Sequence, residues 1–537
     1  MAAADPARIA MRCPGRRDVR GFARYDVVLT YGDLDRRSDA IAAGLARCGL
    51  RRGMRTVVMV RPGPEFFLLM FALFKAGIVP VLVDPGIDKR ALKQCLDEAE
   101  AHAFIGIPLA QVARVVLRWA RSATLTVTVG ARLPWGGPTL EQVERAGTGA
   151  PPQLVATEPD EVAAILFTSG STGVPKGVVY RHRHFVAQID MLREAFGMQP
   201  GGVDLPTFPP FALFDPALGL TSVIPDMDPT RPAQADPRRL LDAIARFGAD
   251  QLFGSPALIK VLAAHGQPLP TIRRVTSAGA PVPPDTVAAM RALLPPDAQL
   301  WTPYGATECL PVAVIESREL AGTRAMTENG FGTCIGHPVA GNVVRLIPVE
   351  DAAILDWSDT REVPDGEIGE ITVAGPVATD TYFNRPEATR LGKIPELLPD
   401  GSTRIVHRMG DLAWRDEEGR LWFCGRKSHR VETPAGPLYT EQVEPVFNQH
   451  PEVRRTALVG VGPRGAQTPV LCVELERGVD GVRHWRRIEE ELLRLGGRHA
   501  GTASVQRFLR HPRFPVDIRH NAKIGRESLA AWAAKRA

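Results

Sequence analysis

Cysteine is scarce in this sequence, and its spacing argues against two common uses of the residue. The chain of 537 residues contains seven cysteines, all far apart, and none of them stands in a C-x-x-C pair. An odd number of widely spaced cysteines indicates neither a disulfide framework nor a zinc site. We therefore expect a cytoplasmic protein, because a reducing cytoplasm keeps thiols free.

Long hydrophobic runs and a strong charge excess are also missing. The most apolar stretch, residues 66–84, is interrupted by Lys75, Gly77 and Pro80, and the first residues contain no apolar core of signal-peptide length. The 65 basic and 60 acidic residues leave a formal net charge of +5, which is small for this length and scattered. These absences argue against a transmembrane segment and against a nucleic-acid partner.

What the sequence does contain is an alternation of helical and strand patterns. After a turn expected at Gly32-Asp33, residues 34–48 carry apolar side chains at helical spacing and precede the β-branched run 56–60. The stretch 66–84 repeats the pattern as a buried helix followed by a strand over 79–83. Such alternation predicts parallel sheets covered by helices. Beyond about Gly332, short strands bounded by turns predict a β-rich subdomain, and we expect a boundary near residues 426–429.

The segment "LFTSGSTGVPKGVV", residues 166–179, combines glycines, hydroxyls and a lysine between two apolar runs. Backbone N–H groups of such a loop can cradle phosphate oxygens, and Lys176 adds a point charge. It is not the phosphate loop of nucleoside triphosphatases, because no Ser or Thr follows the lysine. Taken alone, the segment is also compatible with a flexible loop that binds no ligand.

Four further segments give the loop a specific context. They are "SAGAP" at 277–281, "YGATE" at 304–308, "GDLAWRDEEGRLWFCGRK" at 410–427 and "RHNAKIGR" at 519–526. Together with the loop, in this order, they resemble the adenylate-forming superfamily of acyl-CoA synthetases, luciferases and peptide-synthetase adenylation domains. The resemblance extends from about residue 30 to residue 526. It implies an α/β fold with a large N-terminal domain, residues 1–427, made of two α/β subdomains and a β-rich subdomain. A small mobile α+β domain, residues 428–537, would follow and carry Lys523.

The resemblance also implies ATP and Mg²⁺ as cofactors and gives each motif residue a role. The expected phosphate-binding residues are Thr168, Ser169, Gly170, Ser171, Thr172, Gly173 and Lys176. Those expected on the adenine side are Gly279, Ala280, Pro281, Tyr304 and Gly305. Asp411 and Arg426 would hold the ribose, Thr307 the α-phosphate, Glu308 the Mg²⁺, and Lys523 would bridge the carboxylate and the α-phosphate. Without the resemblance, Asp411 reads as a turn residue, Tyr304 as a core aromatic and Lys523 as a surface lysine.

The sequence departs from the family where the two domains join. Acyl-CoA synthetases usually carry Asp or Lys two residues after the motif arginine, whereas this chain has Ser428, and "GPLY" at 436–439 replaces their usual Gly-Arg. Their hinge lets the small domain rotate so that a thiol can attack the adenylate. The departure puts CoA thiolation in doubt, although ordinary drift of a tolerant loop is an alternative.

A second distinctive segment, residues 206–237, is rich in proline and aromatic residues and lies where the family builds its acyl pocket. We expect Phe208, Phe211, Phe214, Asp215 and Leu218 to line that pocket, with core packing as the alternative for any one of them. The segment resembles the olefin-biosynthesis branch of the superfamily, whose members convert long-chain 2-alkyl-3-hydroxyalkanoic acids to β-lactones.

The branch implies that the substrate's own 3-hydroxyl replaces the thiol and attacks the acyl-adenylate, which explains an altered hinge. His184, His182 and Asp215 are candidate bases by position. The branch also implies a thiolase-like condensing enzyme, a reductase and a decarboxylating hydrolase as partners. Two other hypotheses stay open: a long-chain acyl-CoA or acyl-carrier-protein ligase, and a non-enzymatic scaffold, against which the intact motif residues argue.

Overall fold

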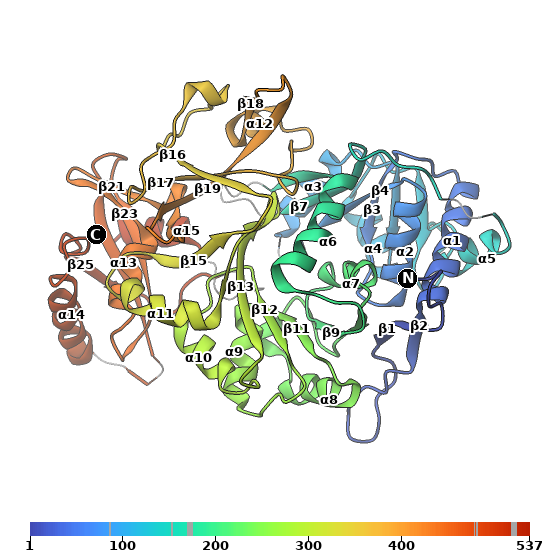
Figure 1. The fold of residues 1–537 in the computed structure, drawn as a ribbon, viewed down its shortest axis with the longest axis horizontal. Coiled ribbons are helices and arrows are strands. Elements are labelled where there is room, and N and C mark those ends of the chain that lie inside the picture. Colours follow the sequence, from blue (N-terminus) through green and yellow to red (C-terminus); the bar gives the residue numbers. More distant parts are fainter. Residues whose placement is uncertain are drawn as a thin grey trace.

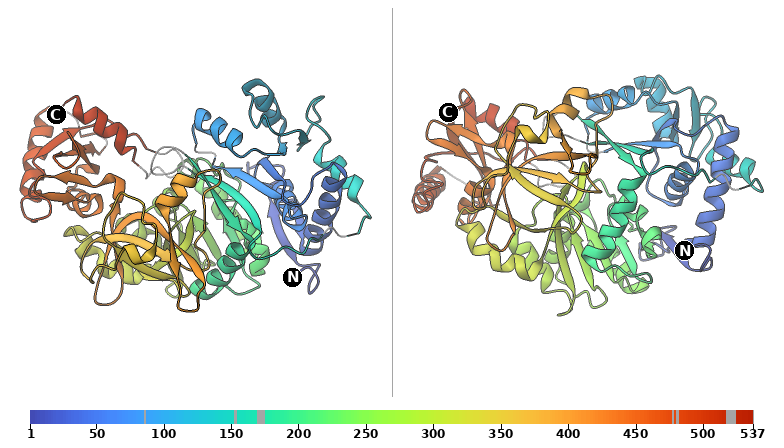
Figure 2. Two further views of the ribbon diagram at one scale, coloured as in Figure 1. Left: turned by 90° about the horizontal axis from the view of Figure 1, so that it is seen from above. Right: turned by 45° about the horizontal axis from the view of Figure 1, so that its top comes forward.

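The structure is a computed structural model that describes residues 1–84, 87–151, 154–168, 175–476, 478–479, 482–516 and 524–536. Successive blocks of the chain follow one another from blue to red in Figure 1. The N-terminal α/β block and the C-terminal block lie at opposite ends of the molecule, as the two views of Figure 2 also show.

The N-terminal block is built on a sheet with the strand order β6-β5-β3-β4-β7-β8. Its strands run parallel except for β8, which pairs antiparallel with β7. The strands are β3 (Arg55–Met59), β4 (Val79–Val83), β5 (Ala103–Gly106), β6 (Leu125–Thr128), β7 (Val162–Thr168) and β8 (Lys176–Arg181). The helices of this block are α1 (Tyr31–Arg47), α2 (Pro64–Lys75), α3 (Lys89–Glu98), α4 (Pro108–Leu117) and α5 (Leu140–Gly147).

Helices cover both faces of this sheet. Val58 and Ile105 pack with the apolar side chains of α2, whereas their neighbours Val57 and Phe104 pack with residues of α3 and α4. Adjacent residues of a strand point to opposite faces, so α2 lies on one face and α3 and α4 lie on the other. The β-strands of a sheet covered on both faces are apolar along their whole length, as the sequence pattern of β4 indicates.

A larger sheet occupies the middle of the molecule. Among the described residues its order is β16-β17-β19-β20-β15-β14-β13-β12-β11-β9-β10-β1-β2, and β18 pairs with β19. Its central strands β9 to β13 are parallel, and β13, β14 and β15 continue it antiparallel. The strands are β1 (Ile9–Cys13), β2 (Val27–Thr30), β9 (Val203–Pro206), β10 (Thr221–Val223), β11 (Gln251–Gly254), β12 (Arg274–Ser277), β13 (Gln299–Ala306), β14 (Cys309–Glu316), β15 (Thr333–Pro338), β16 (Val343–Ile347), β17 (Gly369–Ala374), β18 (Lys393–Leu397), β19 (Thr403–Arg415) and β20 (Leu421–Arg426).

The helices that accompany the larger sheet lie between its strands in the sequence. They are α6 (His182–Phe196), α7 (Asp215–Leu218), α8 (Pro237–Phe247), α9 (Pro256–His265), α10 (Pro284–Arg291), α11 (Ser317–Glu328) and α12 (Pro386–Gly392). The long helix α6 lies at the boundary between the two sheets in Figure 1. It follows β8 directly, so it connects the N-terminal block to the larger sheet.

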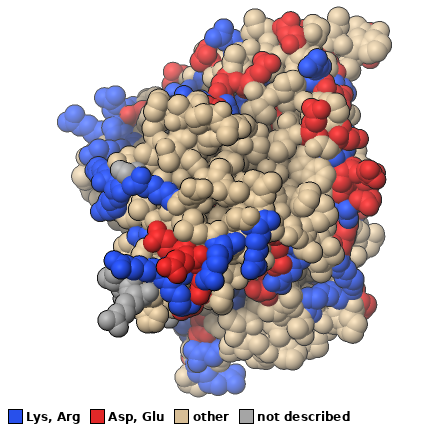
Figure 3. Space-filling view, turned by 90° about the vertical axis from the view of Figure 1, so that its left-hand side faces the viewer, with Lys and Arg blue, Asp and Glu red and all other residues tan. Residues whose placement is uncertain are grey.

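The C-terminal block has its own small sheets and its own core. Its elements are β21 (Val431–Thr433), β22 (Gly436–Leu438), α13 (Thr440–Phe447), β23 (Val453–Val461), β24 (Thr468–Leu475), α14 (Val482–Gly496), β25 (Arg507–Arg510) and α15 (Arg526–Ala534). Val443 of α13, Leu471 of β24 and Leu492 of α14 meet in one buried cluster. Figure 3 views the molecule from this end and shows basic and acidic side chains interspersed. Interspersed charges fit the interpretation of the net charge as ordinary solvated surface.

The predicted α/β fold class is confirmed, including the helix–strand pairs read from the sequence. The expected helix over 66–75 is α2, and the expected strand over 79–83 is β4. The turn expected at Gly32-Asp33 is wrong, because α1 begins at Tyr31 and the side chain of Asp33 accepts a bond from the backbone of the N-cap residue, Thr30. The boundary at 427/428 stays a prediction.

The structure also describes the state of the cysteines and the character of the helices. All seven cysteines are free thiols, and all but Cys48 are buried. Within the described ranges of the chain, we find no helix that combines the length and the apolar character needed to span a bilayer.

Candidate active site

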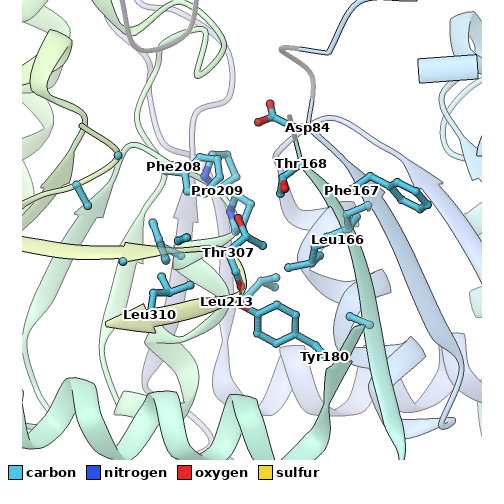
Figure 4. A pocket seen from close by; sticks show the side chains of 18 of the residues that line it. Asp84, Leu166, Phe167, Thr168, Tyr180, Phe208, Pro209, Leu213, Thr307 and Leu310 are labelled. Atoms are coloured by element: carbon cyan, nitrogen blue, oxygen red, sulfur yellow. Dashed lines mark hydrogen bonds between the residues drawn. The ribbon is translucent and has the colours of Figure 1, made fainter. Parts of the chain in front are cut away.

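A cavity of about 1550 Å³ lies between the two large sheets. The carboxyl ends of β3, β4 and β7, the helices α2 and α6, and the turn between β13 and β14 all contribute to its lining. Figure 4 shows Leu166 and Thr168 of β7 pointing toward Thr307 across this space, with Tyr180 of β8 below them. The carboxyl ends of parallel strands are the usual edge for ligand sites in α/β folds.

The turn that carries Thr307 and Glu308 is fixed by hydrogen bonds from both sides. The hydroxyl of Tyr180 donates to the carbonyl of Thr307 at 2.5 Å. The backbone N–H and the hydroxyl of Thr379 both donate to the carbonyl of Glu308 at 2.9 Å. These bonds use the carbonyls, so both side chains are left to face the cavity that they line.

The carboxylate of Glu308 has a specific neighbour. The hydroxyl of Tyr382 donates to its Oε1 at 2.8 Å, and the ammonium of Lys176 lies 5.1 Å from the centre of the Tyr382 ring. Burial lowers the pKa of Lys176, and the charge of Glu308 opposes that shift. A carboxylate held in place beside a lysine is an oxygen donor that fits Mg²⁺, a hard ion that prefers oxygen ligands.

A buried lysine lies behind this group and was not singled out by sequence reasoning. Lys393 of β18 is 4% exposed, and its Nζ donates to the carbonyl and to the hydroxyl of Thr379. Burial lowers the pKa of Lys393 to about 8, and Glu308 counteracts the shift. Thr379, Tyr382 and Lys393 thus support Glu308, although a single sequence offered no signal that would bring them to it.

The expected ribose and adenine groups come together on the neighbouring strands. The register of β19 and β20 places Asp411 opposite Arg426, and Nε of Arg426 lies 3.1 Å from Oδ1 of Asp411. The hydroxyl of Tyr304 donates to Oδ2 of the same carboxylate at 2.6 Å. Burial raises the pKa of Asp411, and the charge of Arg426 and the Tyr304 bond oppose that shift. A carboxylate with this support can accept charge-assisted bonds from two hydroxyls.

The backbone approaches the cavity closely at Gly305 and Gly279, which both line it. A Cβ at Gly305 would lie 2.9 Å from the carbonyl oxygen of Cys309, so a larger residue does not fit there. Gly279 has a φ of +104°, a backbone conformation that favours glycine. Ala280 and Pro281 follow in the loop between β12 and α10 and are not among the residues that line the cavity.

The two ends of the predicted phosphate loop flank the cavity. Thr168 ends β7, Lys176 begins β8, the two residues pair in register, and both line the cavity. Because β7 and β8 run antiparallel, Thr168 and Lys176 both lie at the carboxyl edge of β7. The loop residues Ser169, Gly170, Ser171, Thr172 and Gly173, and also Lys523, lie outside the described residues.

The histidines expected near the pocket differ in their placement. His184 is fully buried at the start of α6, where its Nδ1 accepts the backbone N–H of Arg181 at 2.9 Å and its Nε2 lies 2.7 Å from Nη1 of Arg183. Burial and the Arg183 charge lower the pKa of His184 to about 4. His184 does not line the cavity, whereas His182 does, and burial lowers the pKa of His182 as well.

The aromatic segment lines the cavity, and its role as the acyl pocket stays a prediction. Phe208, Phe211, Phe214, Asp215 and Leu218 all contribute to the wall. The rings pack on one another, with centroids 5.1 Å apart for Phe208 and Phe211.

The acidic group in this wall is paired. The hydroxyl of Ser222 donates to Oδ2 of Asp215 at 2.5 Å, and Asp204 of β9 is its carboxyl neighbour in the same wall. Burial first, and then the charge of a neighbouring carboxylate, raise the pKa of both: Asp250 acts on Asp204, whose pKa rises to about 7, and Asp204 acts on Asp215. The carboxyl group of Asp215 is therefore harder to ionise than that of an ordinary aspartate.

Ion pairs connect the large sheet with the C-terminal block beside the expected hinge. Lys427 to His429 form a short 3-10 turn, and Nζ of Lys427 lies 2.8 Å from the buried carboxylate of Glu370. Beyond the turn, Arg430 and Arg464 of the C-terminal block each place Nη2 2.9 Å from Oδ2 of Asp351. We call the last two contacts the junction ion pairs.

The fold and this site define the class of protein. The chain matches the family described as "AMP-binding enzyme" over residues 2–383 and belongs to that family. Solved structures with the same fold include the amide bond synthetase McbA from Marinactinospora thermotolerans, at a TM-score of 0.78 and 23% identity over 98% of this chain and 97% of that one. ATP-bound MatB from Rhodopseudomonas palustris follows at a TM-score of 0.77 and 21% identity over 99% and 97%.

Sequence relatives narrow the class. The "Olefin beta-lactone synthetase" of Xanthomonas campestris pv. campestris is 71% identical over 99% of this chain and 95% of the relative. The protein of the same description from Stenotrophomonas maltophilia is 70% identical over 98% and 95%. The "Long-chain-fatty-acid--CoA ligase" of Escherichia coli O157:H7 is 26% identical over 85% and 83%. The chain is accordingly an ATP-dependent enzyme of the ligase type, which confirms the predicted family and class of reaction.

Proposed function

We propose that the chain is a β-lactone synthetase that acts on long-chain 2-alkyl-3-hydroxyalkanoic acids in olefin biosynthesis. The observation that carries the proposal is the 71% identity with an olefin β-lactone synthetase over nearly the whole chain. The cavity of about 1550 Å³ agrees with it, because ligand pockets ordinarily measure roughly 300 to 1,000 Å³ and a substrate with two long chains needs more.

The first step is adenylation of the carboxylate. A carboxylate oxygen attacks the α-phosphorus of ATP, the bond from that phosphorus to the bridging oxygen breaks, and pyrophosphate leaves with the electron pair. We assign the phosphates to Thr168 and Lys176 with the loop between them, the ribose to Asp411 and Arg426, and the charge between carboxylate and α-phosphate to Lys523. Mg²⁺ bound at Glu308 would neutralise phosphate charge.

The second step is ring closure. The 3-hydroxyl oxygen attacks the acyl carbon, the bond from that carbon to the AMP oxygen breaks, and AMP leaves as the four-membered ring forms. The hydroxyl is already part of the substrate, so little entropy is left to lose. The hydroxyl proton passes to a base, for which His182 has the more suitable position, since it lines the cavity and stays neutral at pH 7.

The test measures pyrophosphate release and product mass with a synthetic 2-alkyl-3-hydroxy acid, ATP and Mg²⁺, with and without CoA. We expect AMP, pyrophosphate and a lactone mass without CoA. A CoA thioester, or an absence of lactone under every condition, overturns the proposal and favours an acyl-CoA ligase.

Variants assign the roles within the reaction. Lys523→Ala is expected to stop pyrophosphate release, whereas His182→Asn is expected to retain it and to lose the lactone. The matched variant His184→Asn separates the two histidines, because only the base is needed for ring closure alone. We also propose a cytoplasmic location and an assembly with thiolase-like, reductase and decarboxylating hydrolase partners, which co-purification with tagged partners tests.

A further inference from the structure

The cavity has two apolar arms on opposite faces of the N-terminal sheet. One arm, here the aromatic arm, is lined by α6 together with Phe208, Phe211, Leu213 and Leu218. The other, here the α4 arm, is lined by Ile107, by Ala110, Ala113 and Leu117 of α4, and by Trp119.

The strand β7 separates the two arms. Leu166 packs with Ala164 and Tyr180 on the α6 face, whereas Ile165 and Phe167 pack with Ala110 and Trp119 on the α4 face. Figure 4 shows the alternation directly, with Leu166 and Thr168 pointing into the space between the sheets and Phe167 pointing away from it. The two arms meet at the carboxyl edge, where Val83, Asp84 and Thr168 line the same cavity. That edge is also where the predicted phosphate loop begins.

The arms differ in which lining residues are buried. The lining of the aromatic arm includes Leu218 and Asp215, which are 2% and 4% exposed, and also Val186 of α6, which is 57% exposed. The lining of the α4 arm includes Leu109 and Leu117, which are 68% and 45% exposed, so this arm opens at the surface. Leu109, Ala113 and Leu117 are four residues apart and thus share one face of α4.

We propose that each arm holds one of the two alkyl chains of the substrate. The inference rests on the proposed function. In a 2-alkyl-3-hydroxy acid the two chains leave neighbouring carbons beside the reacting carboxyl group. A cavity that divides beside the reacting edge lets both chains leave it without packing against each other, and each then buries its apolar surface separately.

The test uses a grid of 2-alkyl-3-hydroxy acids in which the length of each chain is varied separately. Pyrophosphate release reports adenylation, and product mass reports the lactone. For the unaltered protein we expect kcat/KM to rise as either chain is lengthened, because each chain buries apolar surface in its own arm. A rate that responds to the length of only one chain overturns the proposal.

Two variants assign the arms. Ala113→Phe fills the α4 arm, and we expect it to lower kcat/KM about tenfold for acids that are long on one carbon only. Leu213→Trp fills the aromatic arm, and we expect the same loss for acids that are long on the other carbon. The control Val112→Phe introduces the same residue on the same helix at a position that does not line the cavity, and we expect it to leave the chain-length dependence unchanged. Thermal unfolding of all three variants shows whether they are folded.

A variant at Ala113 or Leu213 that lowers kcat/KM equally for acids that are long on either carbon, or for neither kind of acid, overturns the assignment. The test of the two arms does not require lactone formation, because pyrophosphate release alone reports how chain length affects adenylation. If the protein releases pyrophosphate with these acids but makes no lactone, the proposed function fails while the two arms are still tested.

Discussion

Glu308 stands at the tip of the turn between β13 and β14, and its neighbours fix where its carboxylate lies. The carbonyl of Glu308 is held by Thr379, and the carboxylate is held by Tyr382. Thr379 is in turn bonded by the buried ammonium of Lys393. We propose that these contacts orient Glu308 toward Mg²⁺, and loss of a group that orients a metal ligand typically lowers metal affinity or activity about 10- to 100-fold.

The hydroxyl of Tyr382 can be tested by itself. We expect Tyr382→Phe to raise the Mg²⁺ concentration for half-maximal pyrophosphate release about tenfold, because the carboxylate is free to rotate once the donor is lost. A titration of the rate with Mg²⁺ measures it. Tyr439→Phe, which also removes one phenol but lies outside the cavity lining, is expected to leave the titration unchanged. An unchanged titration for Tyr382→Phe would contradict the orienting role.

The carboxylate of Asp411 is the second residue whose role can be isolated. Asp411→Asn is expected to raise KM for ATP about tenfold, since charge-assisted bonds to the ribose are lost and Arg426 is left without its carboxylate. Steady-state rates at varied ATP measure this. Asp416→Asn serves as the control. It removes a carboxylate whose Oδ2 lies 2.7 Å from Nε of Arg420, and Asp416 does not line the cavity. Equal effects of the two substitutions would show a general loss of stability instead.

At the scale of elements, α6 begins with an unusual cap. His184 accepts the backbone N–H of the N-cap residue, Arg181, with a neutral ring, so this capping bond depends on pH. The ordinary pKa of 6.5 falls to about 4 in the folded state. Unfolding therefore takes up a proton between these values, and the stability that His184 contributes above pH 6.5 is lost as the pH falls toward 4.

In the buried carboxyl pair formed by Asp204 of β9 and Asp215 of α7, the effect of pH on stability has the opposite sign. The pKa of Asp204 rises from 3.8 to about 7 in the folded state. Unfolding therefore releases a proton in this range, and the contribution of Asp204 is present below pH 3.8 and is lost as the pH rises through 7.

Single substitutions test these two opposite effects of pH on the free energy of unfolding. Relative to the unaltered protein, Asp204→Asn is expected to become increasingly more stable as the pH rises from about 4 to 7, because it carries no proton to release. His184→Asn is expected to lose less stability than the unaltered protein as the pH falls through the same range. Denaturant unfolding at a series of pH values measures both. Differences that do not vary with pH would contradict the assigned burial of these groups.

Elements that are determined by neighbouring residues could be predicted from the sequence, whereas contacts between residues far apart in the sequence could not. The helix α2 and the strand β4 follow from local composition, and the pocket segment from its aromatic residues. The support of Glu308 could not be predicted, because Tyr382 lies 74 residues away in the sequence. The burial of His184 away from the cavity could not be predicted for a similar reason. Its proximity to the phosphate loop in sequence does not tell which way the ring points.

On the scale of the whole molecule, the contact between the large sheet and the C-terminal block includes charged groups. The junction ion pairs share one carboxylate, Asp351, whose pKa is lowered by its hydrogen bond with Arg430. Partly exposed ion pairs contribute little free energy each and are screened by salt. The C-terminal block also contacts the larger block through α13, which packs against β20 and α11.

The junction predicts a measurable change in the hinge. Asp351→Asn is expected to increase the rate of proteolytic cleavage within residues 427–433 about two- to fivefold, because opening of the junction becomes easier. The control Asp365→Asn affects only a pair with Arg415, 3.8 Å apart, within the larger block. At high salt the unaltered protein is expected to approach the variant. A cleavage rate that salt and the substitution leave unchanged would show that other contacts hold the block.

The burial of the thiols has a practical consequence for observing such movements. Cys48, at the end of α1, is the one partly exposed cysteine among the seven, and burial raises the pKa of its thiol. A maleimide dye should therefore attach at this position in preference to the others, and faster as the pH rises, because the thiolate is the reacting species. The native chain thus carries one fixed reference point for fluorescence, and a second label on the C-terminal block would turn opening of the junction into a distance that can be followed in solution.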